Sequence, residues 1–143
     1  MDAGTNREDV SVVLALLNAA GRLERRLDRV LSSVRGVSFS EYHLLRELSR
    51  MHQESATRVD LAAAVGLTPS AVTRALKPLE KMGYVVTEKS DRDARRSLAS
   101  LTPAGRHLLA DAQGVVDDSV GLMELGSPDQ TAIAKLLDKL EAR

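Results

Sequence analysis

The sequence contains no cysteine. Without thiols the protein forms no disulfides, binds no metal through thiolates and cannot sense oxidants by cysteine chemistry. Its three histidines, His43, His52 and His107, lie on separate segments and do not form a metal-binding pair. Neither a phosphate-binding glycine loop nor a serine nucleophile motif is present. We therefore expect no enzymatic activity, no metal site and no cofactor.

Aromatic residues are nearly missing as well: the chain has Phe39, Tyr42 and Tyr84, and no tryptophan. Proteins that hold single-stranded nucleic acids do so largely by stacking the bases on aromatic rings. This chain offers almost no such platform. If it binds nucleic acid, we expect the target to be a duplex.

Long apolar runs are missing too, since no stretch approaches the ~20 residues needed to cross a bilayer. The N-terminal stretch MDAGTNRED is polar and lacks the basic segment of a signal peptide. We therefore expect a cytoplasmic protein that does not enter membranes. With 143 residues, 43% of them hydrophobic, the chain is long enough for a single domain, residues 1–143, with its own core.

The formal net charge is zero, but the charges are unevenly distributed. Between residues 68 and 96 there are seven basic and four acidic residues, whereas between residues 97 and 143 there are four basic and seven acidic ones. The middle of the chain is therefore positive and its C-terminal part is negative. A positive segment of this kind is either an ordinary solvated surface or a surface that contacts a phosphate backbone.

Over residues 10–34 apolar residues recur at alternating spacings of three and four, at Val13, Leu16, Ala20, Leu23, Leu27, Val30 and Val34. This spacing predicts a long helix with a coiled-coil-like seam. Such a seam is typical of a helix that packs on a partner helix, which favours a dimer over the alternative of a core helix in a monomer. Gly36 is expected to end this helix.

A helix over residues 38–51, with a capping box at its start, precedes two short helices. The first of these covers residues 59–65 and ends at Gly66. The second begins after Thr68, a favourable N-cap residue, contains Pro78, where we expect a bend, and ends at Gly83. Two helices joined by a tight, glycine-containing turn have the form of a helix-turn-helix.

Residues 52–57 (HQESAT) are predicted to be a polar break between helices. Further along, YVVTEK and RSLASL predict two strands joined by the charged segment SDRDAR, so that a β-hairpin lies beside the helix pair. Two more helices are expected to begin at Thr102-Pro103 and at Ser127-Pro128, and each has an apolar face.

In their order and spacing, these features resemble the MarR family of winged-helix transcriptional regulators over nearly the whole chain. The stretch DRDARRSLASLTPAG is similar to the family's Asp-x-Arg wing tip followed by a strand and Leu-Thr-x-x-Gly, and LTPSAVTRALKPLEKMGYV is similar to its recognition helix. The resemblance implies a mainly α winged helix-turn-helix fold with a small β-hairpin wing. Residues 37–102 would form the DNA-binding lobe, and the helices of residues 1–36 and 103–143 would form a dimerisation region.

The resemblance also implies a homodimer that binds pseudo-palindromic double-stranded DNA, usually as a repressor. The recognition helix would enter a major groove, and its predicted contacts are Thr68, Ser70, Ala71, Thr73, Arg74 and Lys77. We expect Arg74 to bind a guanine, whereas Ser70 and Thr73 would touch bases or phosphates. Lys77 is expected on a phosphate. Ala71 either meets a thymine methyl group or belongs to the core.

At the wing, Arg95 is expected to enter the adjacent minor groove, because a narrow A·T-rich groove concentrates negative potential. Asp93 would hold the guanidinium of Arg95 or of Arg92 by a charge-assisted hydrogen bond and would not touch DNA. Lys89, Arg92 and Arg96 complete the predicted DNA contacts. Each of these side chains is alternatively an exposed charge that contributes little.

Many members of the family release DNA when a small aromatic or phenolic acid binds between the dimer region and the lobe. By resemblance, the residues expected at such a pocket are Leu17, Tyr42, His43 and Leu109, although His43 is alternatively a structural histidine. Two other functions stay open: a winged-helix module that binds a protein in place of DNA, and a regulator without a ligand. The basic residues at the reading positions favour DNA binding over the first of these.

Overall fold

The computed structural model describes residues 3–89 and 97–142, which form six α-helices and a small three-stranded sheet. The helices are α1 (Ala3–Arg35), α2 (Phe39–Ser49), α3 (Arg58–Val65), α4 (Pro69–Lys81), α5 (Pro103–Gly121) and α6 (Ser127–Glu141). The short 3-10 helix η1 (His52–Glu54) is followed by the strand β1 (Ser55–Thr57), and the hairpin strands are β2 (Val85–Glu88) and β3 (Leu98–Leu101).

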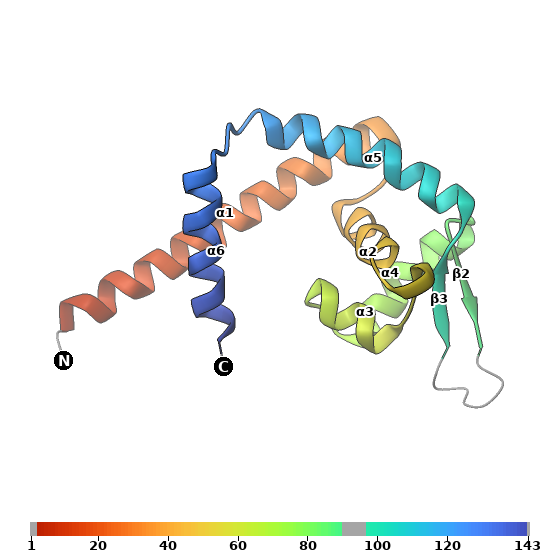
Figure 1. Ribbon diagram of the computed structural model, residues 1–143, viewed down its shortest axis with the longest axis horizontal. Coiled ribbons are helices and arrows are strands. Elements are labelled where there is room, and N and C mark those ends of the chain that lie inside the picture. The colour runs from red at the N-terminus through yellow and green to blue at the C-terminus, as the bar shows by residue number, and fades with distance from the viewer. Residues whose placement is uncertain (1–2, 90–96, 143) are drawn as a thin grey trace.

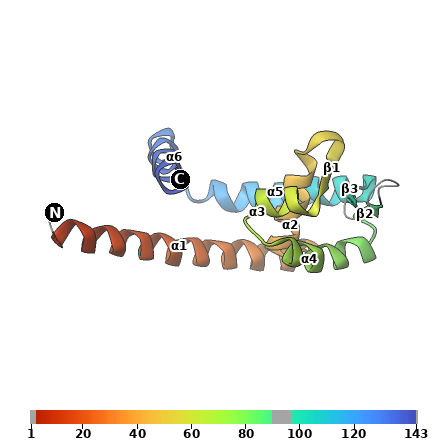
Figure 2. The ribbon, with the colours of Figure 1, turned by 90° about the horizontal axis from the view of Figure 1, so that it is seen from below.

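The molecule has a lobe and an arm (Figure 1). The lobe consists of α2, α3, α4 and the sheet, and the arm consists of α1, α5 and α6. Helix α5 runs from the hairpin along the top of the lobe into the arm. Helices α1 and α6 overlap in Figure 1, but Figure 2 shows that they lie apart. The predicted mainly α winged helix-turn-helix fold is confirmed.

Short-range signals set the helix ends. The side-chain oxygens of Ser38, Thr68 and Thr102 each accept a hydrogen bond from the backbone N–H three residues later, at 3.0, 3.2 and 3.0 Å. These bonds satisfy N–H groups that the first turn of a helix leaves free. After α3 and α4, Gly66 and Gly83 adopt left-handed φ values of +69° and +81°, which end the helices where the sequence predicts.

The sheet has the strand order β1-β3-β2, and both pairs are antiparallel. The hairpin of β2 and β3 is the predicted one. Strand β1 corrects the prediction of a polar break over residues 52–57, because its backbone pairs with β3 and Ser55 Oγ lies 2.6 Å from Ser100 Oγ. Three mostly polar residues carry no alternating pattern, so this strand forms through pairing with β3 and has no signal of its own.

The core of the lobe is aliphatic and is shared by α2, α3, α4 and the hairpin. Its large buried side chains are Leu44, Leu45, Leu48, Leu61, Val72, Leu76, Leu79, Val85 and Leu101. A second cluster, made by Leu31, Val37, Tyr42 and Ala112, joins the lobe to α1 and α5. Burying one such aliphatic side chain stabilises the fold by roughly 1.5–3 kcal/mol. The two clusters therefore hold α4 and the hairpin in a defined place relative to the arm.

Helix α5 begins directly against the base of the hairpin. The hydroxyl of Thr102 donates to the carbonyl of Gly83 at 2.6 Å, and its backbone N–H donates to the carbonyl of Tyr84 at 3.1 Å. A Cβ atom at Gly105 would lie 2.2 Å from the Tyr84 carbonyl oxygen and 2.8 Å from Leu101 Cδ1. The stretch LTPAG thus requires Thr102 for its hydrogen bonds and Gly105 for the close approach of the two backbones.

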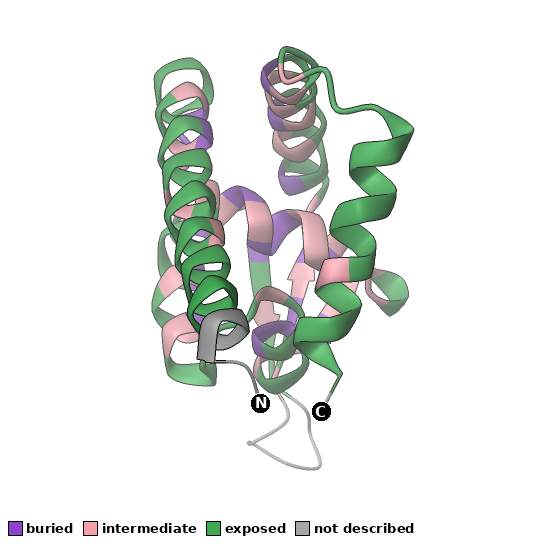
Figure 3. Ribbon diagram, turned by 90° about the vertical axis from the view of Figure 1, so that its left-hand side faces the viewer, coloured by how far each residue is buried: buried purple, intermediate pink, exposed green. Residues whose placement is uncertain are grey.

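Much of the predicted seam on α1 is exposed in the single chain. Leu27 and Leu31 are buried, but the N-terminal half of the helix exposes Val10, Val12, Val13, Leu14 and Leu17, each by 41% to 62%. No described residue of α6 is buried, and its apolar face exposes Ile133, Leu137 and Leu140. Figure 3 shows the exposed surface along both helices. Among the described residues, no helix is long and apolar enough to span a membrane.

Candidate nucleic-acid interface

Helices α3 and α4 form the helix-turn-helix pair, and their turn is set by backbone hydrogen bonds. Gly66 adopts the left-handed conformation after α3, and the N–H of Leu67 donates to the carbonyl of Ala62 at 3.0 Å. Helix α4 then continues through Pro78 to Lys81. Because Val72, Leu76 and Leu79 of α4 are buried in the core, the opposite face of this helix is turned outward.

The outward face of α4 carries the predicted reading residues. Ser70, Arg74 and Lys77 are exposed and are spaced at i, i+4 and i+7, so their side chains share one face of the helix. Ala71 is half-buried, so its exposure does not decide between a contact with a thymine methyl group and a place in the core. A surface with two exposed cations on consecutive turns is suited to a polyanion.

Two threonines at the start of α4 are used by the backbone. Thr68 Oγ1 accepts from the N–H of Ala71 at 3.2 Å, and the hydroxyl of Thr73 donates to the carbonyl of Pro69 at 3.0 Å. Thr68 therefore caps the helix, and both hydroxyls have a backbone partner. This turn is exposed, and the N-terminal end of a helix carries a partial positive charge that favours phosphate.

The hairpin carries a further exposed cation. Lys89, which directly follows β2, is exposed. The other predicted wing residues, Arg92, Asp93, Arg95 and Arg96, lie outside the described residues. Their contacts with DNA and with one another therefore stay predictions.

The structure reveals one side chain that the sequence analysis did not select. Arg58, the first residue of α3, donates from Nη1 to Ser97 Oγ at 2.9 Å, and from Nη2 to Glu80 Oε1 and Thr87 Oγ1, both at 3.4 Å. The hydroxyl of Thr87 also donates to Glu80. This Arg58 network joins α3, α4, β2 and the residue before β3. Its members lie 22 to 39 positions from Arg58, too far apart for a local sequence pattern.

A groove of about 430 Å³ lies between α2 and α5 and is rich in arginine. Its residues are Arg46, Ser49, Arg50, Glu54, Arg106, Leu109, Ala110 and Gln113. Arg106 is held by Glu54 at 3.1 Å, and Arg46 is held by Glu47 at 3.2 Å. Arg46 and Arg50 are four residues apart on one helix, a spacing that the sequence displays, whereas Arg106 joins them only through the fold.

Two of the predicted effector residues lie together, since Leu109 packs against the buried cluster that contains Tyr42, whereas Leu17 does not belong to that cluster. Leu109 lines the α2–α5 groove. Tyr42 is buried, and its hydroxyl donates to Oε1 of Gln113, another residue of the groove, at 2.7 Å. His43 is half-buried against the ring of Phe39, with 5.6 Å between the ring centroids. Leu17 lies in the exposed N-terminal half of α1.

Burial raises the pKa of the Tyr42 hydroxyl above its usual range. The nearby guanidinium of Arg46 lowers this pKa, whereas the carboxylate of Asp117 raises it further. Tyr42 therefore stays protonated at neutral pH, and it acts as a hydrogen-bond donor beside the groove.

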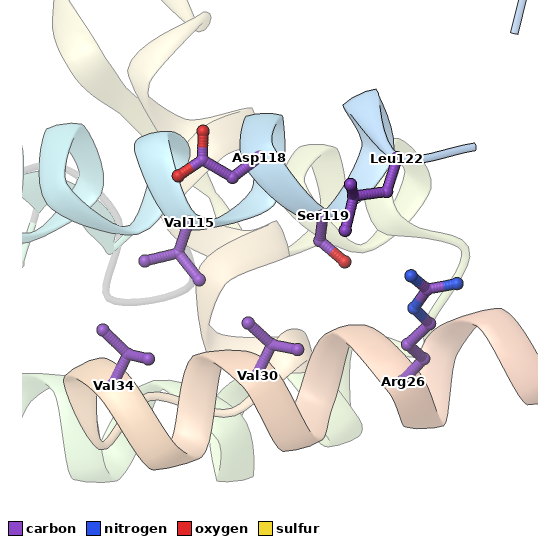
Figure 4. Close-up of a pocket in the computed structure, with 7 residues that line it drawn as sticks. All are labelled: Arg26, Val30, Val34, Val115, Asp118, Ser119 and Leu122. Atoms are coloured by element: carbon purple, nitrogen blue, oxygen red, sulfur yellow. The ribbon is translucent and has the colours of Figure 1, made fainter. Parts of the chain in front are cut away.

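A second pocket, of about 640 Å³, lies between α1 and α5 (Figure 4). Its walls are formed by Arg26, Val30, Val34, Val115, Asp118, Ser119 and Leu122. Val34 and Leu122 are 52% and 76% exposed, so the pocket opens onto the exposed apolar surface of the arm. Such a surface is typical of a contact with another protein chain. Among the described residues, no group of three or more metal-ligating side chains is placed to bind a metal ion.

Comparisons with known proteins point in one direction. A family model described as "MarR family" matches residues 35–96, which include α2, α3 and α4. The HTH-type transcriptional repressor Rv2887 of Mycobacterium tuberculosis is 33% identical over 107 residues, which cover 73% of this chain and 76% of that protein. Both matches include the helix-turn-helix pair, and Rv2887 has a length similar to that of this chain.

Two solved structures are similar along nearly the whole chain. Sco3205, a MarR family transcriptional regulator from Streptomyces coelicolor in complex with DNA, aligns with a TM-score of 0.79 and 27% identity over 94% of this chain and 86% of that one. CouR from Rhodococcus jostii RHA1, bound to p-coumaroyl-CoA, aligns with a TM-score of 0.77 and 27% identity, over 92% and 90% of the two chains. The likeness extends over the lobe and the arm together.

Proposed function

Because the chain belongs to the MarR family of transcriptional regulators, we propose that it is a homodimeric repressor that reads duplex DNA with α4. The observation that carries the proposal is the outward face of α4, where Ser70, Arg74 and Lys77 are exposed together. The DNA complex of Sco3205 supports a duplex target, and the name of Rv2887 supports repression. We propose that the protein has no catalytic role and acts in the cytoplasm.

In this proposal each exposed side chain of α4 has its own task. Arg74 forms two parallel hydrogen bonds with O6 and N7 of a guanine, since its planar guanidinium matches that edge. Lys77, one turn further from the start of α4, neutralises a phosphate and sets the register without reading sequence. Ser70, on the first turn, touches a base edge or a phosphate. Lys89 adds a phosphate contact beside the hairpin.

The arm provides the dimer. Helices α1 and α6 expose apolar faces in the single chain, and a second copy of the chain would cover them. A two-fold dimer places two copies of α4 about 34–36 Å apart, one turn of DNA. The target is therefore an inverted repeat.

We further propose that the α2–α5 groove binds a small anionic ligand with an apolar body. Arg46, Arg50 and Arg106 outnumber their two carboxylate partners, Glu47 and Glu54, and so leave a net positive charge. Leu109 and Ala110 supply an apolar surface. A volume of about 430 Å³ suits an aromatic acid. CouR, which is bound to p-coumaroyl-CoA, supports an anionic aromatic ligand class.

The place of the groove explains how such a ligand would act on DNA binding. Helix α2 belongs to the lobe, whereas α5 runs from the lobe into the arm. A ligand between them favours one angle of the lobe relative to the arm, and thereby one distance between the two copies of α4. Repression is relieved if that distance no longer matches a turn of DNA.

The test of DNA binding uses fluorescence anisotropy on a duplex selected by the wild-type protein from a random pool, over a series of salt concentrations. Arg74→Ala should weaken binding to the selected duplex far more than binding to random duplex. Lys77→Ala should weaken both alike and reduce the slope of log K against log salt by about 0.9. Equal loss on both duplexes for Arg74→Ala would remove this residue as a base reader. If no duplex is enriched, the protein binds a partner protein in place of DNA.

A further inference from the structure

The Arg58 network lies at the junction of the two elements that the proposed function brings to DNA. Glu80 is three residues beyond Lys77 on α4, and Thr87 lies on β2, two residues before Lys89. Ser97 is the residue before β3, on the other strand of the hairpin. One guanidinium thus reaches the recognition helix and both strands of the hairpin from the start of α3.

The network differs from an ordinary surface ion pair. The side chains of Arg58 and Glu80 are only 22% and 31% exposed, and both hold hydroxyl partners in addition to one another. An exposed pair contributes little because water screens it and both chains lose freedom. A partly shielded guanidinium with three acceptors has a fixed direction, since its planar N–H groups demand acceptors in set positions.

Arg58 adds a side-chain link between α4 and the hairpin, because it contacts both Glu80 and Thr87. Val85 pairs with Leu101 at the end of the hairpin that joins α5, and the buried Ala99 lies opposite Thr87, nearer the other end. Near the opposite end, Thr87 and Ser97 are polar and half-buried, and both are held by Arg58. Without these bonds β3 stays paired with β1 through Leu98, whereas β2, an outer strand of the sheet, loses this link to α4 and can tilt relative to that helix.

We propose that Arg58 is a positioning residue for DNA binding: it sets the tilt of the hairpin relative to α4, so that both reach the same duplex. The inference rests on the proposed DNA-binding function. In this role Arg58, Glu80 and Thr87 affect DNA binding by holding the hairpin in place, and none of them touches DNA. Loss of any one of the three should reduce the affinity for the specific duplex and should change which parts of the duplex are protected.

The sign of the Glu80 effect separates this role from simple electrostatics. Glu80→Ala makes the lobe more positive, so a charge effect alone would tighten binding to DNA. Positioning predicts the reverse, because the main acceptor of Arg58 on α4 is gone. Thr87→Val changes neither charge nor size and should weaken binding in the same direction. It also keeps the test available if the Arg58 variants fail to fold.

The experiment compares wild type, Arg58→Met, Arg58→Lys, Glu80→Ala and Thr87→Val on the duplex selected by the wild-type protein. Arg29→Met, an exposed arginine of α1, is the control for loss of one cation. Affinity is measured by anisotropy, with thermal unfolding followed by circular dichroism. Two footprints are taken at saturating protein: methylation of guanine N7 reports the major groove, and hydroxyl-radical cleavage reports the minor-groove side.

We expect about a tenfold loss of affinity in the four network variants, the effect of one charge-assisted hydrogen bond, and wild-type affinity in Arg29→Met. Guanine N7 protection should persist while hydroxyl-radical protection beside it is lost, which a merely less stable protein would not produce. Tighter binding by Glu80→Ala, or a wild-type footprint for Arg58→Lys and Thr87→Val, would overturn the inference. If wild type itself selects no duplex, the proposed function fails, and the inference fails with it.

Discussion

Tyr42 lies where the lobe meets the arm, and its environment illustrates how a single buried polar group contributes. Its ring belongs to the cluster with Leu31 and Ala112, and its hydroxyl donates to Gln113 at 2.7 Å. Because burial raises the pKa of this hydroxyl, the folded protein keeps the proton at a pH where the unfolded chain releases it. Tyr42 therefore makes the stability of the folded protein fall as the pH rises into the alkaline range.

Tyr42→Phe tests this link. Above about pH 10, where tyrosines of the unfolded chain ionise, the free energy of unfolding of the wild type should fall as the pH rises, because only the unfolded state loses the proton. The variant should be less stable by about 1 kcal/mol at neutral pH, where it lacks the hydrogen bond to Gln113. Urea denaturation at pH 7 and between pH 9.5 and 11 measures both effects. An equal fall in both proteins above pH 10 would contradict the assignment.

At the scale of elements, the junction between the hairpin and α5 depends on one glycine. Gly105 lies in the first turn of α5, where its backbone meets the carbonyl of Tyr84. Gly105 is part of the motif LTPAG, which the sequence shows. The physical reason for a glycine there is the contact with Tyr84, 21 positions earlier in the chain. The capping residue Thr102 contacts Gly83 beside it. The end of α4, the base of the hairpin and the start of α5 therefore meet at these residues.

Gly105→Ala should destabilise the protein by about 1–3 kcal/mol, since the added methyl group collides with backbone and not with a flexible side chain. Gly114→Ala in the same helix is the matched control, because none of the neighbouring atoms in the described part of the chain lies within 4 Å of its added Cβ. That change should stabilise α5 by up to about 1 kcal/mol through helix propensity. Thermal unfolding of both variants measures the pair, and similar effects in the two would disprove a specific contact at Gly105.

At the scale of the whole molecule, the arm exposes apolar surface and the lobe presents cations. Ile133 and Leu137 on α6 are 50% and 44% exposed in the single chain. Ile133→Lys combined with Leu137→Lys should split the dimer, because four charges would then be buried in the interface of two copies. Sedimentation velocity should show a monomer, and binding to an inverted repeat should weaken while binding to one half-site persists.

Lys139→Ala, on the polar side of α6, is the control for the dimer variant and should leave the dimer intact. A double variant that sediments as a dimer would place the interface elsewhere on the chain. Near-equal affinity of the variant for an inverted repeat and a half-site is the expected consequence for DNA binding, since a monomer gains nothing from the second half-site.

The ligand groove is also a whole-molecule feature, since it couples the lobe to the arm. Arg106→Gln keeps a polar, though shorter, side chain and removes a charge of the groove. A panel of aromatic carboxylic acids should dissociate the wild-type protein from its duplex, and the variant should need about tenfold more of the active acid. DNA affinity without the acid is measured in parallel. Unchanged sensitivity to the acid would remove the α2–α5 groove as the site.

The sequence by itself determined the local framework of this protein. The caps at Ser38, Thr68 and Thr102, and the helix ends at Gly66 and Gly83, were predictable because each depends on residues within a few positions. The outward face of α4 follows from the same short-range periodicity. The family resemblance rests on these local motifs taken in order.

Only the tertiary structure decided which distant residues act together. Strand β1 exists because β3 pairs with it across more than 40 positions of the chain, and Arg58 finds its acceptors on α4 and the hairpin. Arg106 reaches the groove of Arg46 and Arg50 only once α5 lies against α2. These contacts have no local signal, because they are made by the burial of the core and are stabilised only after it has formed.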